Sequence, residues 1–101
     1  MSTDSSLKIK PLGKSNYPEW SGEMKAYLMR QGTWRLVARK ETKPATTVEA
    51  TAWELKAEKA AGDIYLFVES DQRVHFRGYE EDPIMMWNLL EQAHLSKKPG
   101  A

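Results

Sequence analysis

The chain has 101 residues, 41% hydrophobic and 29% charged, which is enough for one small domain with a modest core. It has no cysteine, and this excludes a disulfide framework, a cysteine-ligated zinc site and a thiol nucleophile. A formal net charge of +1 gives no overall field to attract nucleic acid or a membrane, and no apolar run approaches the ~20 residues of a membrane span.

Residues 1–11 are predicted to form a flexible N-terminal arm. Its first six residues are polar and contain no apolar signal core, so we expect a cytoplasmic rather than a secreted protein. The folded domain is expected to comprise residues 12–96. Residues 97–101 are expected to form a tail or the start of a linker to a second lobe.

A first helix is predicted to begin near residue 17. Asn16 or Tyr17 can act as its cap, and Pro18 suits a first helical turn. Gly32 is a credible stop, and residues 33–38 then form a short second helix or an apolar turn. Side chains at spacings of three and four define one helical face, made of Trp20, Met24, Tyr27, Leu28 and Gln31.

The longest helix follows a linker that covers residues 39–47. Thr46 and Glu49 have the spacing of a capping box, in which each side chain bonds to the other's backbone N–H. The apolar stripe of this helix alternates steps of four and three, which is the clearest periodicity in the chain. It consists of Trp53, Ala57, Ala60, Ile64 and Phe67.

Residues 70–81 are less regular and fit a short strand or an irregular helical turn. The helical interpretation is favoured because no second strand is evident for pairing. Asp82 is predicted to cap a final helix that begins at Pro83. The fold class is therefore all-α, a compact bundle of four to six helices. Its predicted core is Tyr17, Trp20, Trp53, Ile64, Phe67, Trp87 and Leu90.

No cluster of reactive residue types accompanies these aromatic anchors. His75 and His94 are the only histidines, and neither belongs to a motif with metal-ligand spacing. Residues 13–15 match the end of a phosphate-binding loop, but Lys8 stands where its first glycine should be. We therefore predict no catalytic residue, no cofactor, no metal and no small-molecule substrate.

The charges are unevenly distributed along the chain. Residues 30–43 contain five basic residues and one acid, whereas residues 49–71 contain six acids and two lysines. Surfaces of opposite sign suit head-to-tail contacts between copies, although two ordinary solvated faces would give the same pattern. The candidate interface residues are Trp34, Phe76, Tyr79 and Met85.

A weaker alternative is RNA binding through the basic stretch. Single-strand binders combine cations with aromatic side chains, as Trp34 and its basic neighbours do. The low net charge and the acidic helix argue against this as the main role. The candidate RNA contacts are Arg35, Arg39, Lys40 and Lys43.

The N-terminal part of the chain resembles the Gag polyprotein of copia-type LTR retrotransposons. In that family a leucine leads into Asn-Tyr-x-x-Trp, followed by a Met/Leu helix and Gly-x-Trp. The chain lacks the family's Cys/His zinc knuckle and its enzyme regions, so those activities are not carried over. The matching positions are Leu12, Asn16, Tyr17, Trp20, Met24, Leu28, residues 32–34, Trp53, Ile64, Trp87 and Leu90.

This resemblance implies a domain like the N-terminal lobe of a Gag capsid. Its role would be structural: many copies would pack into a shell, or virus-like particle, around element RNA. The implied partner is the chain itself, weakly when the domain is isolated, with RNA bound through regions outside it. The alternative is a domesticated adaptor that holds a partner peptide in a helical groove.

Overall fold

The computed structural model describes residues 8–95. The predicted tail and most of the predicted N-terminal arm lie outside these residues. The all-α prediction is confirmed, because the described residues form helices and no strand beyond one isolated parallel bridge, between Leu12 and Val68. The elements are α1 (Tyr17–Arg30), α2 (Trp34–Val37), α3 (Thr47–Leu66), the 3-10 helix η2 (Ser70–Phe76) and α4 (Pro83–Leu95).

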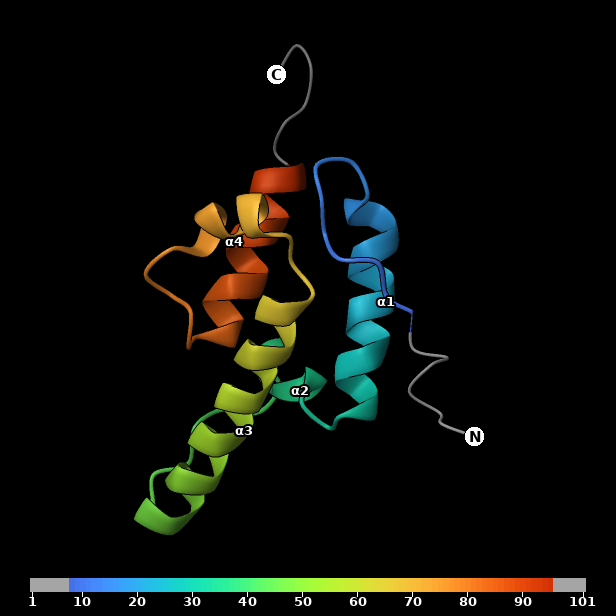
Figure 1. Ribbon diagram of the computed structural model, residues 1–101. Coiled ribbons are helices and arrows are strands. Elements are labelled where there is room, and N and C mark those ends of the chain that lie inside the picture. The colour runs from blue at the N-terminus through green and yellow to red at the C-terminus, as the bar shows by residue number, and fades with distance from the viewer. Residues whose placement is uncertain (1–7, 96–101) are drawn as a thin grey trace.

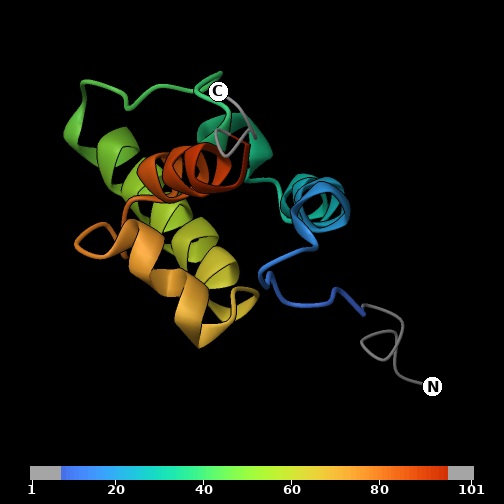
Figure 2. The same cartoon turned by 90° about the horizontal axis from the view of Figure 1, so that it is seen from above.

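The helices surround one core. Figure 1 shows α1 along one side of the molecule and α4 beside the later turns of α3, with α2 joining the two sides. In Figure 2, η2 lies beside α3 and α4 on the side away from α1. The first turns of α3 extend beyond the other helices (Figure 1).

α1 ends where the sequence predicts. Gly32 has φ +77°, a conformation that favours glycine, and its N–H donates to the Met29 carbonyl at 3.1 Å. The Thr33 N–H donates to the Leu28 carbonyl at 2.9 Å. This pair of bonds satisfies two carbonyls that the end of a helix would otherwise leave unpaired.

The same arrangement ends α2, but without a glycine. Arg39 has φ +65°, and its N–H donates to the Leu36 carbonyl at 3.1 Å. The Lys40 N–H donates to the Arg35 carbonyl at 2.8 Å. Among residues 8–95, Arg39 is the only residue other than glycine with a positive φ, a conformation that costs about 1–2 kcal/mol for an ordinary residue.

The predicted N-terminal cap is confirmed for α4 but not for α3. The Met85 N–H donates to the Asp82 carboxylate at 3.1 Å, so the predicted cap of α4 is confirmed. Thr46 does precede α3, but its side chain makes no capping bond. Its hydroxyl donates to the Glu49 carboxylate at 3.0 Å instead, so the predicted reciprocal capping box is wrong in this detail.

The core is built by all five helices and by Leu12 and Val68 from the loops. Most of the predicted core residues lie in it: Tyr17, Trp20, Ile64 and Leu90 are buried, and Phe67 and Trp87 are half-buried at its edge. Stacking of the Trp20 and Trp87 rings, with centroids 5.5 Å apart, joins α1 to α4. Other buried residues include Leu12, Met24, Leu28, Val37, Ala60, Ala61, Val68, Phe76 and Met86.

Trp53 is a correction to the predicted core. It is half-buried and lies outside the core cluster, because no residue in the range 47–56 is buried. Its indole N–H donates to the Glu41 carbonyl at 3.1 Å, which attaches the side chain to the preceding linker. The helical stripe is correctly placed, but the other helices do not extend as far as Trp53.

Phe76 is a correction to the predicted interface. It is 0% exposed, since η2 packs against α4 and turns this ring into the core. The ring lies 6.1 Å from that of Tyr65 on α3, measured between centroids. Phe76 therefore cannot contact a partner without unfolding of this segment.

Candidate interaction surfaces

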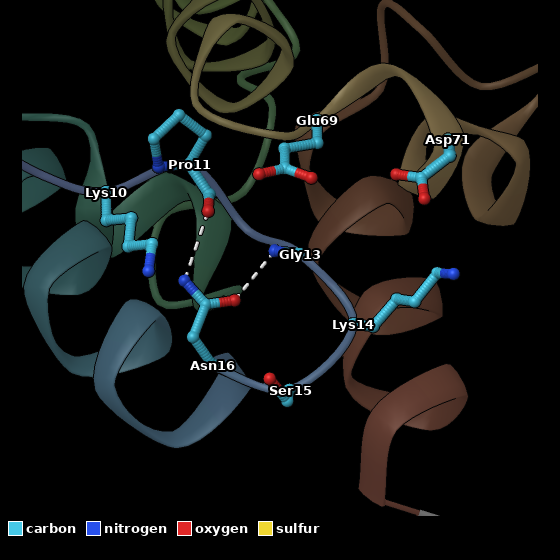
Figure 3. A pocket seen from close by; sticks show the side chains of 8 residues that line it. All are labelled: Lys10, Pro11, Gly13, Lys14, Ser15, Asn16, Glu69 and Asp71. Carbon is cyan, nitrogen blue, oxygen red and sulfur yellow. Dashed lines mark hydrogen bonds between the residues drawn. The ribbon is translucent and has the colours of Figure 1, made fainter.

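The family-like motif organises the loop before α1. The Gly13 N–H donates to the Asn16 side-chain oxygen at 2.6 Å, and the Asn16 amide donates to the Pro11 carbonyl at 3.1 Å (Figure 3). Asn16 occupies the N-cap position, but its side chain makes no capping bond to α1. The predicted capping role is therefore replaced by closure of the loop.

The same motif joins this loop to the end of α3. The Phe67 carbonyl accepts the Trp20 indole N–H at 2.8 Å and the Leu12 N–H at 2.8 Å. The Glu69 N–H donates to the Leu12 carbonyl at 3.0 Å, which completes the bridge beside Val68. The Asn-Tyr-x-x-Trp residues thus close the loop and pack in the core.

An open hollow of about 250 Å³ lies over this loop (Figure 3). Its charged lining is balanced, with Lys10 and Lys14 on the loop, Glu69 just before η2 and Asp71 in its first turn. The Gly13 N–H is already engaged by Asn16, so it is not free to donate to a phosphate. The balanced charge also gives no preference for an anion, so the hollow does not favour phosphate at residues 13–15.

A second polar cluster joins α1, η2 and α4. The Tyr17 and His94 rings stack with centroids 5.2 Å apart, and His75 meets His94 edge-on at 5.7 Å. His94 Nε2 lies 2.9 Å from the Gln72 side-chain oxygen. Burial, together with the Glu91 charge, raises the pKa of Tyr17 to about 12. Within residues 8–95, no three His, Asp or Glu side chains lie close enough together to hold a metal ion.

The predicted basic residues divide into two groups. Arg35, Arg39 and Lys40 are exposed around the end of α2, and no ion pair to a carboxylate is found for them in the described part of the chain. Lys43 forms an ion pair with Glu54 on α3. The first three residues form what we call the basic rim, and Lys43 does not belong to it.

Trp34 connects the basic rim to the core. Its ring meets Trp87 edge-on at 5.2 Å, and Lys25 Nζ lies 5.3 Å from the ring centroid. Trp34 also borders an open hollow of about 270 Å³ between α2 and α4, here called the α2–α4 hollow. Its lining is mostly apolar, with Arg39 at one side: Trp34, Val37, Ala38, Arg39, Ile84, Trp87 and Asn88.

The most exposed of the large apolar side chains lie on α3, and the sequence reasoning missed them. Val48, Leu55 and Leu66 are 81%, 62% and 71% exposed. They belong to a second stripe at positions 48, 52, 55, 59, 62 and 66, which again alternates steps of four and three. This outer stripe was detectable in the sequence, but only one face of the helix had been assigned an apolar role.

The middle of the outer stripe is bordered by acidic residues. Glu58, Glu80 and Glu81 line an open hollow of about 310 Å³ whose floor includes Gly62. Asp63 lies next to Gly62, and burial raises the pKa of its carboxyl, an effect that Lys59 partly opposes. Because Gly62 has no side chain, another backbone can approach α3 closely at this point.

The other two candidate interface residues have intermediate positions. Tyr79 is 44% exposed in the loop before α4. Met85 is half-buried on α4, whereas its neighbour Met86 is fully buried. Neither residue belongs to the outer stripe or lines the α2–α4 hollow.

No helix among residues 8–95 combines the length and the apolar character required to cross a membrane. Comparison with protein-family models, with curated proteins and with solved structures gave no match.

Proposed function

We propose that this chain is a non-enzymatic structural domain that associates with copies of itself, as the N-terminal lobe of a retrotransposon Gag capsid does in a shell around element RNA. The observation that carries the proposal is the outer stripe of α3. Val48 and Leu55 are more than half exposed in the first half of α3, whose first turns extend beyond the other helices, and Leu66 is exposed at the other end of the helix. Apolar side chains that gather on one exposed face, as Val48, Ala52 and Leu55 do, are typical of protein–protein contacts.

The resemblance to Gag gains support from the role of its motif. Asn16 closes the loop before α1, and the Trp20 indole bonds across 47 residues to the end of α3. A motif that fixes the geometry of a small helical domain suits a building block. It does not suit a site of chemistry, because the side-chain polar atoms of Asn16 and Trp20 are used in internal hydrogen bonds.

The proposal is tested by sedimentation velocity of the isolated chain between micromolar and millimolar concentration. We expect a reversible rise in the average sedimentation coefficient, with weak individual contacts. A shell needs many contacts that can each break and reform. A chain that stays strictly monomeric at millimolar concentration contradicts the proposal.

A second candidate function is an adaptor that binds a peptide, and the α2–α4 hollow favours it. Trp34, Ile84 and Trp87 offer an apolar floor beside Arg39, which suits an acidic peptide with an apolar anchor. This function predicts saturable peptide binding with no change in the oligomeric state. Titration of such a peptide, followed by tryptophan fluorescence and light scattering together, separates it from self-association.

RNA binding remains the third candidate, and the basic rim is its support. Fluorescence anisotropy with a single-stranded RNA at 50 mM and 200 mM salt tests it. True phosphate contacts weaken steeply with salt, by a slope set by the number of cations engaged. With Lys43 paired to Glu54, we expect only a shallow dependence and weak affinity.

A further inference from the structure

The outer stripe of α3 is apolar at its ends and acidic along its borders. Glu49 and Glu58 occupy helix positions next to the stripe, and Glu80 and Glu81 face it across the hollow at Gly62. Lys59 is a cation within the stripe. Lys56 is held by the Glu41 carboxylate at 2.9 Å. The surface around Leu55 and Gly62 therefore carries an excess of negative charge.

This charge argues against a symmetric contact. If two outer stripes paired with each other, the acidic borders of one copy would face the acidic borders of the next. Like charges placed opposite one another across an interface weaken it and disfavour that partner. A complementary partner should present an apolar recess with positive charge beside it.

The same chain carries such a surface. The α2–α4 hollow has an apolar floor of Trp34, Ile84 and Trp87, and a volume of about 270 Å³ that accommodates a leucine side chain. Arg39 lines one side of it, with Arg35 and Lys40 exposed nearby. The hollow and its rim share no residue with the outer stripe or its acidic border.

We propose that copies of this chain join head to tail, with the outer stripe of α3 in one copy docked on the α2–α4 hollow of the next. Leu55 enters the hollow, and the basic rim faces Glu58 and its acidic neighbours. The inference rests on the proposed self-association and names its two surfaces. A contact between two different surfaces leaves one of each free at the ends, so the assembly continues to grow.

The backbone at Arg39 supports a role for this side chain. A residue in the left-handed conformation at the end of a helix is usually glycine, but here it is Arg39. Strained backbone conformations of this kind cluster at functional sites. In the proposed contact, Arg39 supplies a positive charge at the edge of the hollow.

The test uses one variant for each surface. Leu55→Lys removes the apolar side chain and places a cation opposite the basic rim. Arg39→Glu reverses the charge beside the hollow. We expect each variant alone to weaken self-association at least tenfold in sedimentation velocity, with an unchanged circular dichroism spectrum. Val74→Lys, at a 49% exposed position on η2, and Lys14→Glu, on the loop before α1, are matched controls that should associate as the wild type does.

Mixing the two variants gives the sharpest result. Leu55→Lys retains an intact hollow and Arg39→Glu retains an intact outer stripe, so a 1:1 mixture should form a heterodimer. The contact in that heterodimer should have near wild-type affinity. A symmetric contact through α3 predicts instead that Arg39→Glu associates normally and that mixing changes nothing.

Several outcomes overturn the inference, and they are distinguishable from one another. If the wild type associates and Arg39→Glu associates equally well, the named surfaces are wrong but the proposed function stands. The same holds if the mixture of defective variants stays monomeric, or if Arg39→Glu loses only RNA binding. If the wild type is monomeric at millimolar concentration, both the inference and the proposed function are wrong.

A third variant separates folding from contact. Arg39→Gly relieves the left-handed backbone while removing the charge, so it should raise the urea midpoint of unfolding and weaken association. A variant that is more stable yet less associated cannot be explained by damage to the fold. Association equal to that of the wild type would contradict the role assigned to Arg39.

Discussion

The two halves of α3 share one helix and one periodicity but have opposite environments. In residues 57–66, Ala57, Ala60, Ala61 and Ile64 are buried against the rest of the molecule. In residues 47–56, nothing is buried, and Val48 and Leu55 are largely exposed. A helical stripe therefore shows which side chains share a face, but only the neighbouring helices decide how much of that face is covered.

The largest predicted difference is between a tryptophan of the core, against which the second half of α3 packs, and a tryptophan of the exposed first half. Trp20→Ala should cost about 3–5 kcal/mol, because a 1% exposed side chain and its indole hydrogen bond to Phe67 are both lost. That loss is a large fraction of the stability of a small domain. Trp53→Ala should cost much less, since the ring is half-buried and outside the core. Urea unfolding followed by circular dichroism measures both.

Equal losses in the free energy of unfolding for these two substitutions would contradict this prediction. It would mean that the first half of α3 contributes to the cooperative fold as strongly as the core does. Loss of helix signal confined to a few residues in Trp53→Ala would instead show that the first half of α3 frays locally while the core stays folded.

A smaller difference should separate two alanines of α3. Ala60 is 0% exposed, so Ala60→Leu forces extra volume into a packed core and should cost about 1–3 kcal/mol. Ala52 is exposed on the outer stripe, so Ala52→Leu should change stability by less than about 0.5 kcal/mol. Thermal unfolding of the pair checks this. A large loss in Ala52→Leu would show that the outer stripe is covered in the monomer.

The smallest effect concerns the pH dependence of the buried region. Tyr17 ordinarily would titrate near 10.0, and burial raises its pKa to about 12 in the folded chain. Its contribution to stability is therefore fully present below pH 10 and is lost as the pH rises toward 12, because the unfolded chain releases the proton first. Urea midpoints at pH 9 and pH 11 measure this loss. Tyr17→Phe should show a smaller fall between these pH values than the wild type, and an unchanged fall would contradict the assignment.

Features controlled by a few neighbouring residues were predictable from the sequence. Asp82 caps α4 and Gly32 ends α1 because the residue type at one position decides each structure. Residues 70–76 form the irregular helical segment that was favoured over a strand. In each case the information lies within a few residues of the feature.

Burial was less predictable, because it depends on residues distant in the sequence. Phe76 is in the core only because η2 packs against α4, and Trp53 is outside it only because the other helices end short of it. Asn16 was expected to cap a helix, but its side chain bonds back to Pro11 and Gly13. The outer stripe was missed because a second apolar face on one helix becomes meaningful only when the first is known to be covered.

Glu41 gives the exposed half of α3 a property that burial does not supply. Its carbonyl accepts the Trp53 indole N–H, and its carboxylate accepts Lys56 Nζ at 2.9 and 3.2 Å. The linker between α2 and α3 therefore stabilises the first half of α3 through contacts outside the core. A surface held rigid before it meets a partner loses little conformational entropy on binding, so even a small contact area can give useful affinity. Trp53 would then matter to assembly by keeping its helix ready for contact, without touching the partner at all.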